Sequence, residues 1–99
     1  MQDTIDYVNN LNDKTLIKLN LNYLKQNGLI NEREFNTISR ENGFRTRFNY
    51  PGMGKCALSN YSNCWMKKYQ MIHGPIIKKH GNNYRLTDVW KNILDRADF

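Results

Sequence analysis

Acidic side chains are missing from almost half of this chain, because no aspartate or glutamate lies between Glu41 and Asp88. Residues 42–87 nevertheless contain eight lysines and arginines and both histidines, and the formal net charge of the whole chain is +6. A solvated protein surface normally mixes charges of both signs. The missing acids therefore predict a basic face, and the commonest partner of such a face is a polyanion.

Cysteine and long apolar runs are also scarce. Two cysteines are too few for a disulfide framework, so the expected compartment is the reducing cytoplasm of a prokaryotic or host cell. Apolar runs reach only two or three residues, as at 76–77, whereas a membrane span needs about 20. Asp3 and Asp6 stand where a signal peptide would be positively charged. We expect one domain over residues 1–99, with no contact with a membrane.

Groups for metal binding and catalysis are few and poorly spaced. The possible zinc ligands are Cys56, Cys64, His73 and His80. Zinc sites usually pair ligands two to five residues apart, which these are not, and Cys64 lies on an apolar stripe that predicts a core position. Residues 52–55 lack the first glycine of a phosphate-binding loop. No carboxylate in the basic segment can pair with either histidine. We expect no metal, no cofactor and no enzymatic activity.

Hydrophobic spacing predicts several helices. They cover residues 15–26, 32–42 and 57–73, with a short helix over 3–11 and a last one opened by Thr87 or Asp88. Alternation at 17, 19, 21 and 23 would also suit a strand. Gly28 decides for a helix, since it fits the left-handed position of a Schellman cap, with Leu29 against Leu24. Asn31 and Glu34 form a capping box for the helix over 32–42, which Gly43 ends.

The segment 57–87 has the clearest pattern. Apolar residues follow a helical spacing at Leu58, Tyr61, Trp65 and Ile72, with Cys64 and Tyr69 beside them. Gly74 and Pro75 end this predicted helix. Two short strands follow over 76–79 and 84–87, and residues 80–83 supply the turn of a β-hairpin.

This order of elements resembles a winged helix-turn-helix domain. The resemblance rests on residues 65–69, 72–77 and 78–87, and it covers residues 57–94. It implies an α+β, mostly helical fold of about four helices with a C-terminal β-hairpin wing. It also implies that the helix 57–73 enters the major groove of DNA while the wing contacts phosphates. The chain departs from such domains at residues 44–56, where they have a tight turn.

The candidate DNA-binding residues divide among three segments. They are Arg45, Arg47 and Lys55 in the loop; Ser59, Asn60, Asn63, Lys67 and Lys68 on the helix; and Lys78, Lys79, Asn82 and Arg85 in the hairpin, beside His80. Asparagine can pair with adenine, and lysine can reach guanine or phosphate. The loop also interleaves arginines with Phe48 and Tyr50. These rings either cover the core or stack on the bases of a single strand.

The resulting hypothesis is a small basic protein that binds duplex DNA sequence-specifically, as a transcriptional regulator. One alternative is a viral or mobile-element protein whose basic face inhibits a host protein or a ribonucleoprotein. Another is RNA binding through residues 45–50. Trp90, Ile93 and Leu94 on the last helix either pack the core or form a homodimer contact.

Overall fold

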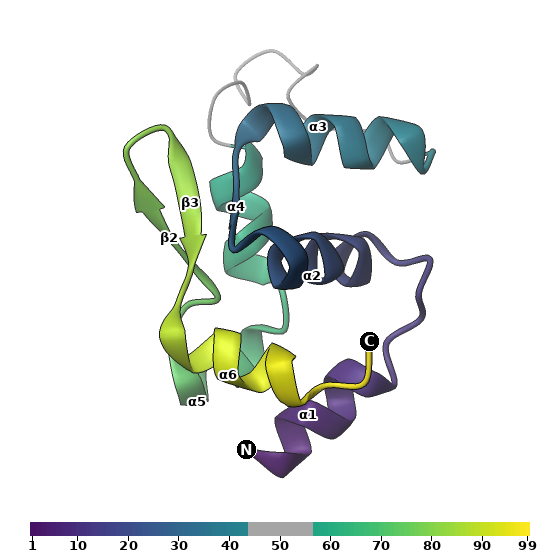
Figure 1. Cartoon of the computed structure of the whole chain (residues 1–99), viewed down its shortest axis with the longest axis vertical. Coiled ribbons are helices and arrows are strands. Elements are labelled where there is room, and N and C mark those ends of the chain that lie inside the picture. Colours follow the sequence, from purple (N-terminus) through teal and green to yellow (C-terminus); the bar gives the residue numbers. More distant parts are fainter. Residues whose placement is uncertain (44–56) are drawn as a thin grey trace.

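The computed structural model describes residues 1–43 and 57–99 and has an α+β, mostly helical architecture (Figure 1). The elements are α1 (Gln2–Asn9), α2 (Leu16–Asn27), β1 (Leu29–Ile30), α3 (Glu32–Glu41), α4 (Ala57–Cys64), α5 (Lys67–His73), β2 (Ile77–His80), β3 (Asn83–Leu86) and α6 (Asp88–Arg96). In the part of the chain described, no helix is long and apolar enough to cross a bilayer.

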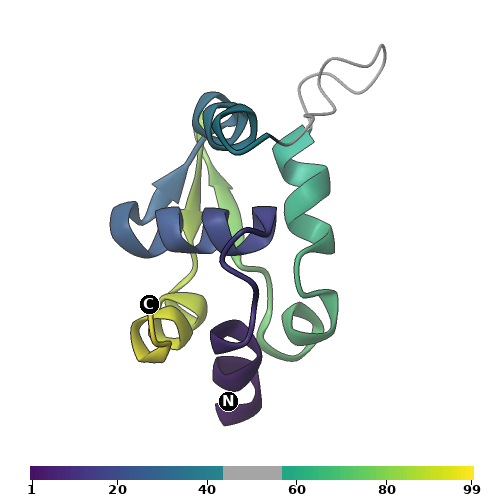
Figure 2. The same ribbon diagram turned by 90° about the vertical axis from the view of Figure 1, so that its right-hand side faces the viewer.

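The three strands form one antiparallel sheet in the order β1-β3-β2. The hairpin of β2 and β3 stands to one side of the helices (Figure 1), while α1 and α6 lie together at the end of the molecule opposite α3 (Figure 2). The predicted hairpin is confirmed. Gly81 has φ 65°, and it is followed by Asn82 with an ordinary negative φ, the pattern of a type II′ turn.

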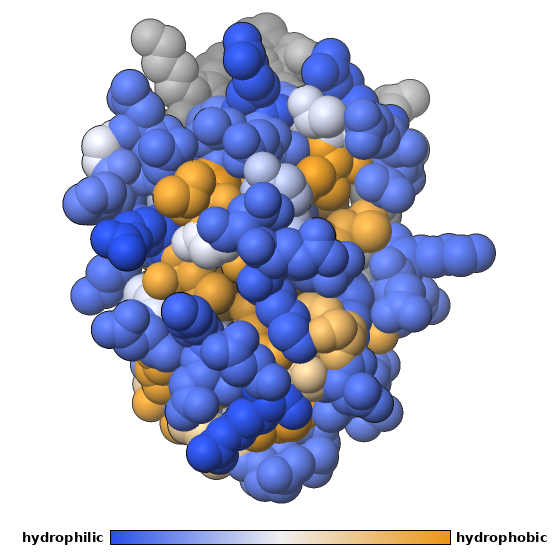
Figure 3. All heavy atoms as spheres, in the orientation of Figure 1, coloured by the Kyte–Doolittle hydropathy of each residue, from blue (hydrophilic) through white to orange (hydrophobic). Residues whose placement is uncertain are grey.

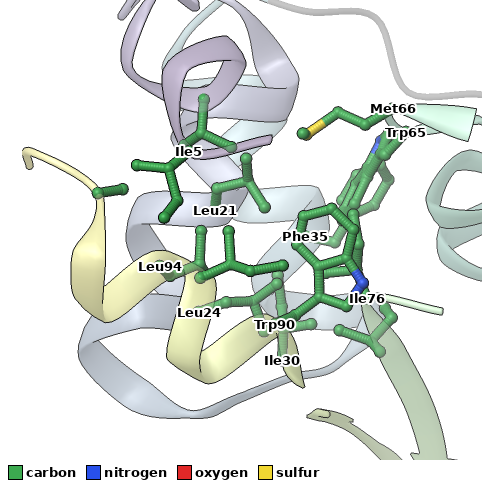
Figure 4. Close-up of a cluster of buried hydrophobic side chains, with 14 of the residues drawn as sticks. Ile5, Leu21, Leu24, Ile30, Phe35, Trp65, Met66, Ile76, Trp90 and Leu94 are labelled. Atoms are coloured by element: carbon green, nitrogen blue, oxygen red, sulfur yellow. The ribbon is translucent and has the colours of Figure 1, made fainter. Parts of the chain in front are cut away.

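The sheet and the helices share one apolar core (Figure 4). Phe35 of α3 packs near Trp65, with ring centroids 6.3 Å apart. Trp90, Ile93 and Leu94 of α6 are fully buried. The apolar face predicted for the last helix is therefore confirmed as core, and these three side chains are not exposed for a dimer contact.

The predicted helix ends are confirmed in part. Gly28 has φ 79°, and its N–H donates to the carbonyl of Leu24 at 2.8 Å, which is the bond of the simpler αL motif rather than of a Schellman cap. Leu29 is 39% exposed and enters β1.

The capping box of α3 is half formed. The Asn31 side chain accepts from the Glu34 N–H at 2.9 Å, as predicted. Burial, together with the nearby Glu34 carboxylate, raises the pKa of Tyr23.

The predicted single helix over 57–73 is wrong, because the chain breaks it into α4 and α5. Met66 between them is left-handed, with φ 46° and ψ 47°. Trp65 and Met66 both point into the core beside Phe35 (Figure 4), so their burial offsets the cost of this backbone conformation, about 1–2 kcal/mol. The predicted core positions of Cys64 and Ile72 are also wrong, because Cys64 is exposed and Ile72 is 64% exposed.

Candidate nucleic-acid interface

The outer face of the sheet carries three basic side chains of the hairpin, whereas Lys79, opposite Tyr84, alternates to the other face and is exposed there. Lys78 on β2 lies directly opposite Arg85 on β3, and His80 lies opposite Asn83. Because side chains alternate across a strand, Ile77 and Leu86 point to the core while Lys78, His80 and Arg85 point away from it. All three outward side chains are exposed. The hairpin pattern therefore aims three basic groups at solvent from one surface.

Like charges in direct cross-strand register repel each other. Neither Lys78 nor Arg85 makes an ion pair with a described carboxylate. Both line an open groove of about 500 Å³ with Lys79, His80 and residues 86–88. Asp88 is the one acidic residue among these lining residues. The groove has the character of an anion site.

A set of hydrogen bonds holds the hairpin against the helices. Thr87 Oγ1 donates to the carbonyl of Pro75 at 2.8 Å, and Trp90 Nε1 donates to that of Gly74, also at 2.8 Å. At the other edge, the Leu86 N–H donates to the Gly28 carbonyl at 2.9 Å. These bonds all lie at the base of the hairpin, where its strands join the helices, so they support the strands that carry the cations.

Gln70 connects the broken helix to the hairpin. Its amide nitrogen donates to the carbonyl of Ser62 at 2.7 Å and to that of Trp65. Its amide oxygen accepts from the Ile76 N–H at 3.1 Å, just before β2. One side chain thus ties the end of α4, the break and the start of the hairpin together.

The helical candidates do not join the hairpin cations in one groove. Asn63 is exposed on α4, and Lys67 and Lys68 are exposed on the first turn of α5. Lys68 lines a different groove, between α5 and α1, and no described residue lines both grooves. Its ammonium lies 5.7 Å from the ring centroid of Tyr69. The break at Met66 therefore divides the candidate set that a single helix would have kept together.

Other candidates fall outside the description or have structural partners. Arg45, Arg47 and Lys55 lie outside the described residues, as do Cys56, the turn at 52–55 and the side chains of Ser59 and Asn60. Asn82 is exposed in the hairpin turn. His73 Nε2 is 2.7 Å from the buried Thr4 hydroxyl, and its ring meets Trp90 edge-on. Among residues 1–43 and 57–99, no three His, Cys, Asp or Glu side chains lie close enough to hold a metal.

Two residues of this surface were missed by the sequence reasoning. Leu29 pairs with Arg85 through the two-residue strand β1, which places an exposed leucine beside the cations. Asp88 lies in the groove because α6 begins directly after β3. The position of Leu29 follows from pairing across the sheet and has no local signal, whereas that of Asp88 follows from the start of α6 two residues after the end of β3.

No protein-family model matches this chain, and neither a curated protein nor a solved structure shows significant similarity to it.

Proposed function

We propose that this chain is a winged-helix-like domain that binds duplex DNA and acts as a transcriptional regulator, with its β-hairpin on the phosphate backbone. The observation that carries the proposal is the Lys78–Arg85 pair, two cations held opposite each other without an ion pair to a described carboxylate. A phosphate placed between them would turn their repulsion into two charge-assisted contacts.

The order of the helices and strands also supports a winged-helix-like domain. Helices precede a hairpin, and β1, from between α2 and α3, adds a third strand to it, which fits a wing anchored to a helical layer. In this proposal the hairpin supplies affinity that depends on salt. Sequence-specific contacts would come from polar side chains outside the hairpin groove, with the exposed Asn63 a described candidate.

The proposal is tested by titrating the full chain with randomised duplex DNA at several salt concentrations. We expect the apparent association constant to fall steeply with salt. Lys78→Gln and Arg85→Gln should each weaken binding and lower the log–log salt slope by about 0.9. Lys91→Gln is the matched control, because Lys91 is exposed on α6 and does not line the hairpin groove. The Lys91→Gln variant should have the same log–log salt slope as wild type within experimental error.

The other outcomes separate the alternatives. Binding without salt dependence, or equal losses in the hairpin variants and the control, would remove the phosphate-contacting role. Single strands that outcompete duplex would favour RNA or single-stranded DNA. If no nucleic acid binds and the chain instead holds one acidic host protein or ribonucleoprotein, the inhibitor alternative is correct.

A further inference from the structure

The groove between α1 and α5 is the larger of the two described above, with a volume of about 610 Å³. Exposed apolar residues lie in this groove and beside it. Tyr7 is 43% exposed and Ile72 64%, and Met71 beside Ile72 on α5 reaches 79%. Figure 3 shows the opposite side of the molecule, where α6 lies in front of α5 (Figure 1) and apolar atoms are interspersed with polar side chains. A groove with exposed apolar residues rimmed by polar groups is typical of a protein contact.

The two walls of this groove carry opposite charges. Asp3 and Asp6 line it from α1, and Lys68 lines it from α5, where Lys67 is its neighbour. None of these four groups makes an ion pair with another described residue; Asp6 accepts a hydrogen bond from Gln2 at 2.9 Å. The groove therefore presents an acidic wall, an apolar strip and a basic wall, and its charged groups make no ion pairs with other described residues.

We propose that this groove is a self-association surface at which two copies of the chain meet around a two-fold axis. In an isologous contact, residue i of one copy meets residue j of the other, and j meets i. Asp6 of each copy then faces Lys68 of the other, with Ile72 and Met71 between the two ion pairs. A second copy supplies both missing charges at once. A polyanion would meet the carboxylates of Asp3 and Asp6.

The size of the surface sets the strength of this contact. The groove is formed by helices of eight and seven residues, fewer than the roughly 20–30 residues a side of a standard interface. We expect a weak dimer, with a Kd between about 10 µM and about 1 mM. Because the groove shares no residue with the hairpin groove, the dimer leaves Lys78 and Arg85 accessible. The inference does not depend on DNA binding.

The test is sedimentation velocity of the full chain at protein concentrations below and above this Kd. Wild type should shift reversibly from monomer to dimer. Ile72→Ser should raise the Kd at least about tenfold, because the side chain is lost from both copies. Leu29→Ser is the matched control: it removes an exposed leucine outside the groove and should leave the Kd unchanged. Circular dichroism should show the same helix content in all variants.

Charge reversal gives the sharper result. Asp6→Lys alone and Lys68→Glu alone should each be monomeric, since like charges then face each other twice. Mixing the two variants should restore a dimer of one copy of each, because one ion pair is then re-formed with reversed sign and the other keeps its native sign. A monomer at every concentration of wild type would overturn the proposal. The proposal would also be overturned if Ile72→Ser left the dimer Kd unchanged, or if the mixed charge-reversal variants failed to associate although each was folded.

Discussion

Gln70 offers the most direct test of how the broken helix is held. The Gln70→Ala substitution removes three hydrogen bonds, two to the carbonyls of Ser62 and Trp65 and one from the Ile76 N–H. Ile76 is fully buried, so its N–H would lose its partner away from water, at a cost of about 1–3 kcal/mol. The donor bonds add about 0.5–1.5 kcal/mol each, partly offset by the better helix propensity of alanine.

The sum predicts a loss of about 2–5 kcal/mol of unfolding free energy, or about 10–25 °C in Tm at about 5 °C per kcal/mol for a domain of this length. Urea unfolding followed by the fluorescence of Trp65 and Trp90 measures it. Met71→Ala is the control on the same helix, where the side chain is exposed, and it should stay within about 0.5 kcal/mol of wild type. A loss below about 1 kcal/mol for Gln70→Ala would refute the clamp.

Two further predictions concern single side chains. Burial raises the pKa of Glu32, and this effect outweighs the hydrogen bond from the Leu58 N–H, which lowers the pKa. Glu32 therefore stabilises the fold most at pH values below its ordinary pKa, and this stabilisation is lost as pH rises through the raised pKa of the folded state. Glu32→Gln should flatten the pH dependence of urea unfolding in that acidic range, and an unchanged slope would contradict this. Phe99→Ala removes the ring that lies 4.1 Å from Lys18 Nζ and 4.8 Å from Lys25 Nζ. It should cost about 1–2 kcal/mol, with Asp98→Ala as the unaffected control; equal Tm values would exclude the ring contacts.

Local signals account for most of the elements that the sequence predicts. Helical spacing with a glycine at φ 79° locates the end of α2, and Asn31 locates the start of α3. Gly81 gives the hairpin its turn, and strand alternation then determines that Lys78 and Arg85 share the outer face. In each case the physical cause lies within a few residues of the feature, so the feature can be predicted from a single sequence.

The features that escaped prediction depend on distant contacts. β1 is two residues long and exists because Leu29 and Ile30 pair with Arg85 and Tyr84. The left-handed Met66 has no glycine or proline near it to indicate a break. Its conformation is stabilised by the burial of two neighbouring side chains and by Gln70. The period of the apolar residues continues across 65 and 66, so the sequence alone favours one helix where the core requires two.

The break also changes what α4 and α5 can do at a nucleic acid. In a continuous helix, Asn63 and Lys67 would lie four residues apart on one face, close enough to enter one groove together. Because Met66 turns the chain between them, Lys67 starts a helix whose neighbouring Lys68 lines the groove with α1. The basic charge of residues 42–87 is therefore not one patch in the described part of the chain. The hairpin cations stand alone as a candidate anion site, whereas Lys68 lines a groove with Asp3 and Asp6 of α1, where its charge suits a protein contact better than a phosphate.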